Sequence, residues 1–441
     1  MLTGFIRAFR TPDLRKKLLF TLGILVVFRL GSTLPTPGIN ERNVSLCAGL
    51  AQKSSANGVY QIVNLLSGNA LRYMSVFALG IMPYITASII LQLLTVVIPR
   101  LEALKEEGQS GQTKITQYTR YLTVGLGILQ STGFIEMARS GMLFPGSQCS
   151  ATVNPIITDA SVFRIAMMIT VMVGGTAVVM WLGELITDRG VGNGMSVLIF
   201  TQVIAVIPGE MLAIYQSKHA FVAAMALVVV VAIVAFVVFM EQAQRRIPVQ
   251  YAKRMVGRRM YGGTSTYIPM KVNQAGVIPV IFSSSLIYIP QLATSLFRNN
   301  AHPQAWVSWV DRNLAQSTGN IYIGLFLGLT IAFTFFYVSI TFNPVEVSDN
   351  MKKYGGFIPG IRPGRPTAEY LNYVLMRLTT PGALYLGVVA VFPLVALNMI
   401  GVANQFPFSG ISLLIMVGVG LDTVKQIESQ LQQRNYEGFL R

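Results

Sequence analysis

Basic side chains between two apolar segments are the residues of this chain best placed to do chemistry. The stretch from Arg245 to Gly263, RRIPVQYAKRMVGRRMYGG, contains no acidic residue. Such side chains neutralise anionic groups, including the phosphates of RNA. A long basic segment between two membrane spans stays in the cytoplasm, so we expect it to hold a large partner. The basic residues of the stretch are Arg245, Arg246, Lys253, Arg254, Arg258 and Arg259.

The other reactive side chains do not form a recognisable catalytic or metal-binding pattern. The two histidines, His219 and His302, stand alone, and two cysteines are too few for a structural zinc site. The sequence contains neither a phosphate-binding loop motif nor a zinc-binding helix motif. We therefore expect no enzyme activity, no cofactor and no metal, and an energy supply from a partner or a gradient.

Composition places the chain in a membrane. Of its 441 residues, 52% are hydrophobic and only 12% are charged, and the mean hydropathy is +0.55. A soluble domain carries about 25% charged residues. Repeated apolar runs of roughly 20 residues predict a polytopic membrane protein. The predicted spans are residues 17–36, 76–98, 118–137, 162–184, 194–212, 220–240, 273–293, 320–342, 375–397 and 407–424.

The distribution of positive charge predicts the topology. With the N-terminus inside, 25 of the 34 lysines and arginines fall in cytoplasmic segments and 6 in outer loops. Positive residues accumulate on the cytoplasmic side of membrane proteins, so we expect both termini in the cytoplasm of a cell with this chain in its plasma membrane. This asymmetry also explains the net charge of +16 better than nucleic-acid binding alone does.

Ten spans with both ends inside are compatible with two groups of five. An odd number of spans per group gives the two groups opposite orientations, as in an inverted repeat. The sequence offers no convincing residue-level identity between these halves. The predicted units are residues 1–213 and 219–441, with cytoplasmic docking loops at 241–271 and 343–372 and a tail at 425–441.

One apolar segment is too short to span. Residues 60–73, YQIVNLLSGNALRY, are amphipathic and are interrupted by a Ser-Gly pair. A segment of this length is either re-entrant or an interfacial helix. Re-entrant backbone must be covered by protein or must line a wet cavity. Both interpretations remain open from the residues alone.

Two predicted spans carry small and polar residues along their length. The spans at 76–98 and 273–293 each begin with Gly-x-x-Pro, which predicts a break or a bend. Small and hydroxyl residues allow close helix contact and weak interhelical hydrogen bonds, so such a seam parts at low cost. Ordinary small-residue packing explains the same pattern. The residues concerned are Thr86, Ser88, Gln92, Asn273, Ser283, Ser284 and Ser285.

The positions of the acidic residues disfavour a secondary transporter, which is one alternative function. Membrane-embedded carboxylates mark proton- and ion-coupled transport. Here the carboxylates near spans, such as Glu184, Glu241 and Asp422, fall at span ends. A secondary transporter with inverted repeats therefore remains the second hypothesis. A membrane scaffold for a cytoplasmic complex is the third, and it leaves the 60–73 segment without a role.

Five long motifs follow one another along the chain. They are FALGIMPYITASIILQLL (77–94), EEGQSGQTKITQYTRYLT (106–123), GELITDRGVGNGMS (183–196), KVNQAGVIPVIF (271–282) and FNPVEVSDNMKKYGGFIPGIRPGRPT (342–367). These motifs resemble those of the SecY family, the pore-forming subunits of the bacterial protein-conducting translocon. The resemblance runs from about Leu14 to Gly438.

The resemblance implies a fold and a function. The fold is an all-α clamshell of two inverted five-helix halves, hinged on the outer side between spans 5 and 6, with a central hourglass pore. Spans 2 and 7 form a lateral gate, and residues 60–73 form a plug around Asn64, Leu65, Leu66, Ser67, Gly68, Asn69, Ala70, Leu71 and Arg72. Unfolded secretory polypeptides cross the pore, and transmembrane segments leave sideways into lipid.

The resemblance also places an apolar ring at the pore's narrowest point. Apolar side chains offer nothing to water or ions, so a narrow empty pore dewets. One member, Met195, departs from the usual isoleucine and is more flexible. The ring residues are Ile81, Ile85, Met195, Ile199, Ile281 and Ile415.

Partners are implied in the same way. The basic loops, with Arg362 and Arg365 added to the stretch described above, are expected to bind the SecA ATPase or the ribosome through ribosomal RNA and proteins. SecE-like and SecG-like small membrane subunits are expected beside the chain, and polypeptides with signal sequences are the expected substrates.

The two cysteines suggest one further contact. Cys47 and Cys149 both fall in predicted outer loops, on the oxidising side of the membrane. We hypothesise a disulfide between them that ties these loops together.

Overall fold

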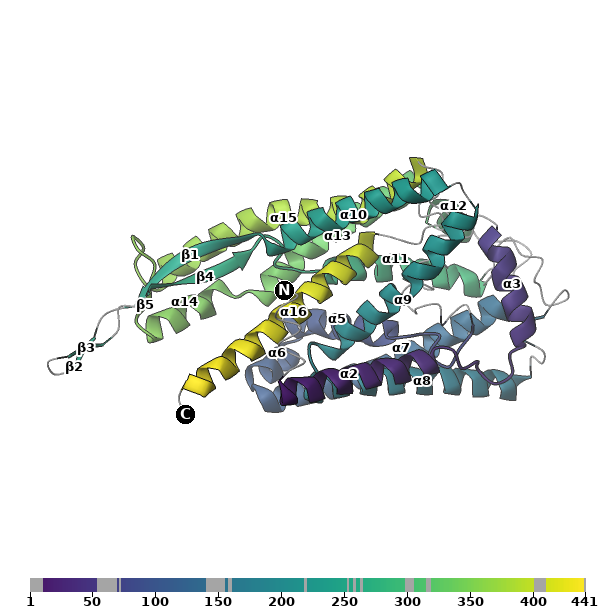
Figure 1. Cartoon of the computed structure of the whole chain (residues 1–441), viewed down its shortest axis with the longest axis horizontal. Helices are drawn as coiled ribbons and strands as arrows, with labels where there is room; N and C mark the ends of the chain where they lie inside the picture. The colour runs from purple at the N-terminus through teal and green to yellow at the C-terminus, as the bar shows by residue number, and fades with distance from the viewer. Residues whose placement is uncertain are drawn as a thin grey trace.

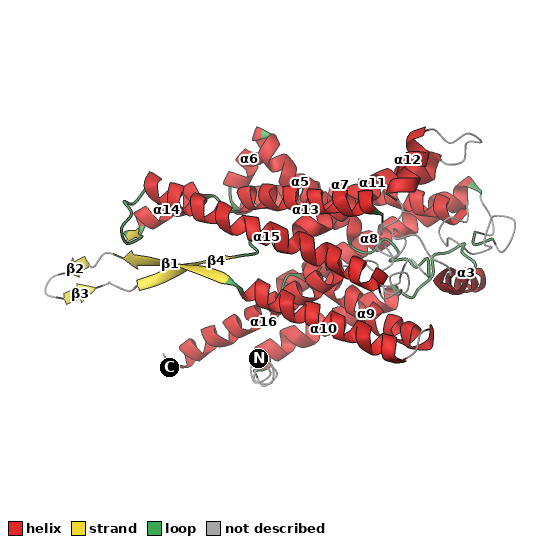
Figure 2. Ribbon diagram, turned by 90° about the horizontal axis from the view of Figure 1, so that it is seen from above, coloured by secondary structure: helices red, strands yellow, loops and turns green. Residues whose placement is uncertain are grey.

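The computed structural model describes residues 11–53, 70, 73–139, 155–157, 161–217, 220–251, 254–256, 259–261, 265–297, 305–314, 319–399 and 410–439. These residues form an elongated helical bundle (Figure 1). A small sheet projects from one end, and the short helices α3 (Glu41–Lys53) and α12 (Ala305–Asn313) lie at the opposite end in both views (Figures 1 and 2).

Ten helices coincide with the ten predicted spans, and their lengths run from 16 to 35 residues. They are α2 (Pro12–Gly31), α5 (Met82–Val97), α7 (Gln109–Arg139), α8 (Val162–Arg189), α9 (Gly194–Ser217), α10 (Ala220–Gln242), α11 (Ile278–Phe297), α13 (Asn320–Thr341), α15 (Arg365–Met399) and α16 (Gly410–Phe439).

By length and hydropathy alone, four helices within the described ranges could cross a membrane, or five if the pair α5 and α6 (Pro99–Glu106) counts as one span bent by 105°. Shorter apolar stretches occur in α9, α10 and α11. In α2, charged side chains such as Lys16 and Lys17 shorten the apolar stretch.

The two predicted docking loops share one folded unit. Strand β1 (Gln244–Tyr251) pairs antiparallel with β4 (Ser265–Lys271) and with β5 (Gly356–Phe357), in the order β4-β1-β5. Inward side chains of β1 pack with α14 (Pro344–Lys353) and α15 in one apolar cluster. Strands β2 (Arg254–Val256) and β3 (Arg259–Tyr261) form a separate hairpin. Much of the basic stretch, which we predicted as a docking loop, therefore forms β-strands.

The Gly-x-x-Pro sequences begin helices instead of bending them. Gly80 and Gly276 have positive φ angles of 55° and 62°, in the left-handed region that glycine adopts without strain. Helices α5 and α11 start two residues later, with Pro83 and Pro279 in their first turns. A first-turn proline sacrifices no helical hydrogen bond. The predicted break is thus a helix start, and both helices are shorter than the predicted spans.

The same halves match at the starts of α9 and α16. The sequences are GMSVLI from Gly194 and GISLLI from Gly410, which share glycine, serine, leucine and isoleucine in register. A Cβ at Gly194 would overlap the carbonyl oxygen of Gly183 on α8, and one at Gly410 would overlap that of Val389 on α15. Our expectation of no residue-level identity between the halves was therefore wrong at these two helix starts.

A second pair of glycine contacts follows the same symmetry. A Cβ at Gly175 of α8 would overlap the carbonyl oxygen of Val76, four residues before Gly80. A Cβ at Gly382 of α15 would overlap that of Val272, four residues before Gly276. Glycine permits this close backbone approach in both halves. The segment before α5 thus packs against α8, and the segment before α11 packs against α15. Each of these two helices is the fourth of its own half.

Candidate functional site: an apolar constriction, a helix seam and a basic end

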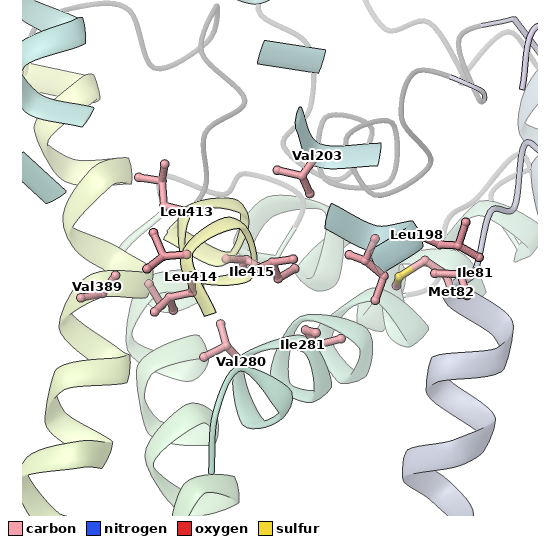
Figure 3. Packing of buried hydrophobic residues seen from close by; sticks show 14 of the residues in the cluster. Ile81, Met82, Leu198, Val203, Val280, Ile281, Val389, Leu413, Leu414 and Ile415 are labelled. Atoms are coloured by element: carbon pink, nitrogen blue, oxygen red, sulfur yellow. The ribbon is translucent and has the colours of Figure 1, made fainter. Parts of the chain in front are cut away.

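The six predicted ring residues lie in one apolar cluster. Ile81 and Ile415 are each 1% exposed, Ile199 and Ile281 are buried, and Ile85 and Met195 pack against them. Four separate segments contribute: the start of α5, α9, α11 and α16. Figure 3 shows Ile81, Ile281 and Ile415 in one region together with Leu198 and Leu414.

The constriction's chemistry follows from its side chains. Each ring member is an aliphatic or thioether side chain with no strong hydrogen-bond donor or acceptor. The four contributing helices belong to two different halves, so the ring lies where the halves meet. Such a collar repels water and ions when it is empty, and it offers no sequence preference to an extended chain.

The internal repeat adds two residues that sequence analysis missed. Val277 occupies the place of Ile81, since Ile281 N donates to Val277 O at 3.2 Å just as Ile85 N donates to Ile81 O at 3.1 Å. Ile411 occupies the place of Met195 in the GxSxLI alignment and is buried. Both belong to or pack against the ring's cluster. The signal was in the sequence, but it only becomes convincing once the helix starts are known.

The predicted gate hydroxyls bond within their own helices. Thr86 Oγ1 donates to Met82 O at 3.0 Å, and Ser283 Oγ donates to Pro279 O at 2.8 Å. Ser284 and Ser285 both donate to Ile281 O, at 2.7 and 2.9 Å. Ser88 is partly buried and Gln92 is exposed. These hydroxyls therefore remove polarity from the seam rather than bridge it, which differs from the cross-seam bonds that we expected.

Helix α11 meets α5 and α7 along this seam. The rings of Phe134 on α7 and Tyr288 on α11 stack, with centroids 6.3 Å apart. The Tyr288 hydroxyl is buried and has no hydrogen-bond partner within the described ranges. A buried hydroxyl without a partner costs about 1–3 kcal/mol, so it weakens the closed seam.

Asn273 has a role other than the one we expected. It lies in the turn before α11, and its Nδ2 donates to Glu241 Oε1 of α10 at 2.6 Å and to Gly276 O at 3.3 Å. Glu241 is buried, and nearby Lys271 pairs with Asp422 of α16 at 3.5 Å. The contacts described for Asn273 thus fix the entrance of α11 to its own half.

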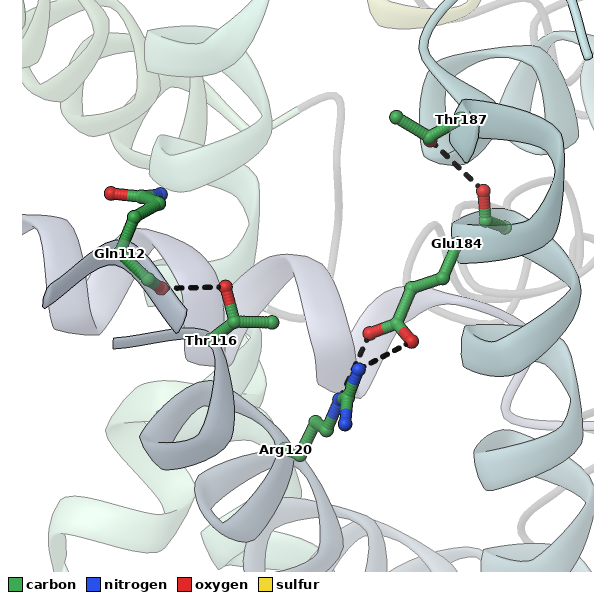
Figure 4. Close-up of polar contacts among 6 residues, drawn as sticks. Gln112, Thr116, Arg120, Glu184 and Thr187 are labelled. Atoms are coloured by element: carbon green, nitrogen blue, oxygen red, sulfur yellow. Dashed lines mark hydrogen bonds and ion pairs between the residues drawn. The ribbon is translucent and has the colours of Figure 1, made fainter. Parts of the chain in front are cut away.

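The N-terminal half has a different polar contact. Arg120 of α7 donates from Nε and Nη2 to the two carboxylate oxygens of Glu184 on α8, at 3.0 and 2.7 Å (Figure 4). The side chains are 46% and 23% exposed. A bidentate ion pair has well-defined geometry, but exposure to solvent limits its contribution to roughly 0.2–1 kcal/mol.

Basic side chains gather on the end that carries the sheet. Arg245 and Arg246 are exposed on β1, and Arg246 lies over the Tyr267 ring at 4.8 Å. Arg362 is exposed before α15, and exposed Arg365 pairs with Glu369 at 3.2 Å. Arg254 and Arg259 belong to the β2–β3 hairpin, although the description there covers the backbone alone. Lys253 and Arg258 lie outside the described residues.

Most of the predicted plug lies outside the described residues. Of Asn64 to Arg72, the structure describes Ala70, which is buried and accepts a hydrogen bond from Ser75 N at 3.0 Å. Of the two cysteines in the predicted disulfide, the structure describes one. Cys47 is buried and disulfide-bonded, while its predicted partner Cys149 lies outside the described residues.

Two inverted groups of five helices around an apolar constriction define a channel subunit of a membrane. The SecY family model matches residues 75–424. The protein translocase subunit SecY of Streptomyces scabiei is 61% identical, and the alignment covers 100% of both chains. The chain therefore belongs to the SecY family.

Solved structures support the fold. One, described as showing that the plug domain of the SecY protein stabilises the closed state of the translocation channel, has a TM-score of 0.62 at 17% identity, covering 94% of this chain and 91% of that one. Canine Sec61 in a ribosome–channel complex has a TM-score of 0.58 at 16% identity, covering 94% and 91%. The predicted ten-span clamshell is confirmed.

Proposed function

We propose that this chain forms the pore through which unfolded secretory polypeptides cross the cytoplasmic membrane, and that it releases transmembrane segments sideways into lipid. The observation that carries the proposal is the ring: six aliphatic or thioether side chains from four segments in one cluster. An enzyme pocket needs placed polar groups, whereas a conduit for chains of any sequence needs an adaptable apolar collar. Energy then comes from a motor or the ribosome, and the chain catalyses no reaction.

Val277 and Ile411 extend the ring in this proposal. The inverted repeat pairs Ile81 with Val277, Ile85 with Ile281, Met195 with Ile411 and Ile199 with Ile415. A collar built from two-fold related pairs closes evenly around a chain. A methionine at one position lets the collar adjust, since its side chain is unbranched.

Residues 60–73 are proposed to seal the outer side of this collar. The segment joins α3 to the turn before α5, and Ala70 at its end is buried beside Ser75. The solved SecY structure above is described as assigning a sealing role to that protein's plug. The plug and the ring together close the pore, so we expect a variant that lacks either one to leak ions.

Single-channel conductance in a planar bilayer tests the pore and the plug together. The variants are a deletion of Asn64–Arg72, Ile281→Ser in the ring, and Ile289→Ser as a matched control on the exposed face of the same helix. We expect the intact chain with its small subunits to be tight, and the first two variants to conduct ions. A tight plug deletion and a tight Ile281→Ser would overturn the proposal, because a transporter or a scaffold needs neither seal.

The basic end is proposed to dock the motor and the ribosome. Exposed Arg245, Arg246 and Arg362 present guanidinium groups on a folded support, and the canine Sec61 neighbour is described in a ribosome–channel complex. Phosphate contacts by arginine weaken steeply with salt. This end, both termini and the tail 425–441 are then cytoplasmic, and SecE-like and SecG-like subunits bind within the membrane.

Charge reversal tests the docking surface. Arg246→Glu with Arg362→Glu is expected to lower affinity for ribosomes and for the SecA ATPase in binding assays, and to flatten the salt dependence. Arg312→Glu, at the opposite end of the molecule, is the control. Unchanged binding by the double variant would rule out this surface.

The pairing of Cys47 with Cys149 remains a proposal. The buried, disulfide-bonded Cys47 supports it, since the sequence contains only two cysteines. Mass spectrometry of peptides digested without reduction should recover one linked pair. Recovery of both as free thiols from oxidised cells would exclude the bond.

A further inference from the structure

Helix α12 has two faces of different chemistry. Val307 and Val310, with Leu314 just after the helix, are buried at 1%, 8% and 4% exposure. Trp306 and Trp309 are three residues apart, so they share another face, and they are 41% and 54% exposed. They are two of the three tryptophans in the whole chain. A helix that buries valines on one face and exposes indole rings on another suits the interface between water and the membrane.

The position of α12 matches such a boundary. It connects α11 to α13 at the end of the molecule away from the sheet (Figures 1 and 2). The exposed faces of those two helices are apolar, with Ile289 on α11 and Ile321 on α13 about half exposed. The two tryptophans therefore lie at the outer edge of the apolar surface that α11 and α13 present to lipid tails.

We propose that α12 is an interfacial anchor that seats Trp306 and Trp309 among the phospholipid headgroups of the outer leaflet. Indole rings are amphipathic and collect at the headgroup level of bilayers. Arg312, in the last turn, is exposed and supplies a cation for lipid phosphates. Lipid is favoured over a protein partner because the two rings are continuous with a lipid-facing surface.

The anchor is attached to the gate helix. Gln291 of α11 is buried, and its Nε2 donates to the carbonyl oxygen of Leu314 at the end of α12. Movement of the outer end of α11 must therefore carry α12 with it or break this bond. On the proposed gate function, the anchor holds α11 in its closed position, and its strength depends on the headgroup layer.

Tryptophan fluorescence tests the anchor directly. In Trp181→Phe, Trp306 and Trp309 are the remaining tryptophans, and in Trp306→Phe with Trp309→Phe only Trp181, within α8, remains. Both variants are reconstituted in phosphatidylcholine vesicles brominated at shallow or deep acyl positions. We expect shallow bromines to quench Trp306 and Trp309 most strongly. Trp181 lies three residues from the inner end of the predicted span 162–184, so its quenching gives a comparison profile for a second position near a headgroup layer. Emission from Trp306 and Trp309 that no brominated lipid quenches, or that deep bromines quench best, would overturn the anchor.

A translocation assay tests the link to the gate separately. Trp306→Ala with Trp309→Ala should raise export of a substrate with a weakened signal sequence, relative to Ser308→Ala on the same helix. Shallow quenching without any change in export would retain the anchor and reject its coupling to the gate. A plug deletion and an Ile281→Ser variant that both stay tight to ions would instead reject the channel itself, so the two failures are distinguishable.

Discussion

The two halves of this chain begin their gate and pore helices in the same way but hold them with different polar contacts. In both halves, a left-handed glycine precedes the gate helix, and a GxSxLI sequence starts the pore helix. In the N-terminal half, the described polar clamp is the half-exposed Arg120–Glu184 pair between α7 and α8. In the C-terminal half, it is the buried Glu241–Asn273 bond at the entrance of α11.

The difference indicates which gate helix is the more firmly fixed. A buried hydrogen bond to a carboxylate contributes about 1.5–3 kcal/mol, more than an exposed pair. It acts on the turn that leads directly into α11, whereas the Arg120–Glu184 hydrogen bonds join α7 to α8 and do not themselves hold α5. Gate opening should then involve movement at α5 and its neighbours against a fixed entrance of α11. We expect the shared features to shape the ring and the unshared ones to set how easily each wall moves.

We expect the largest effect from substitutions at the close glycine–backbone contacts that both halves share. Gly175→Ala and Gly382→Ala would each drive a methyl group into a backbone carbonyl oxygen, of Val76 and Val272 respectively. Backbone cannot move aside as a side chain can, so each should destabilise the protein by about 1–3 kcal/mol or more. Thermal unfolding in detergent measures this.

Gly324→Ala on α13, where a methyl group meets nothing within 4 Å, is the matched control and should be neutral or slightly stabilising. If one of the two glycine variants behaves like this control, the two halves are not equivalent at their fourth helices.

The next largest effect concerns the polar contacts in which the two halves differ. Glu241→Ala leaves the buried Asn273 amide without its carboxylate partner and should cost about 2 kcal/mol, whereas Glu184→Ala should cost less than about 1 kcal/mol. Glu369→Ala, at a well-exposed pair, gives the baseline. Denaturant titrations of all three variants rank them, and equal losses for Glu241→Ala and Glu184→Ala would remove the proposed difference in fixation.

The smallest effect concerns the seam itself. Tyr288→Phe removes a buried hydroxyl that has no partner within the described ranges and keeps the ring stacked on Phe134. The closed seam should gain about 1 kcal/mol. Export of a substrate with a weakened signal sequence should then fall severalfold. Tyr373→Phe, at an exposed position on α15, is the control, and increased export by Tyr288→Phe would contradict the expected sign.

The sequence predicted the helical architecture more securely than the site. Long apolar runs place the helices, since a membrane demands about 20 apolar residues per span. Helix starts were harder, because Gly-x-x-Pro reads equally as a break or as a beginning, and only the φ angles of Gly80 and Gly276 distinguish the two. The six ring residues came from a family resemblance, since an isoleucine in an apolar helix carries no signal of its own.

By itself, the amino-acid sequence determined the membrane class, the order of the helices, the predicted cytoplasmic position of the basic segments and the family. Those properties depend on composition and on local runs of residues. The tertiary structure decided which carbonyl oxygens Gly194 and Gly410 approach, which helix receives the amide of Asn273, and that two distant basic loops form one sheet. These contacts join residues tens or hundreds of positions apart, and no local pattern specifies such pairs.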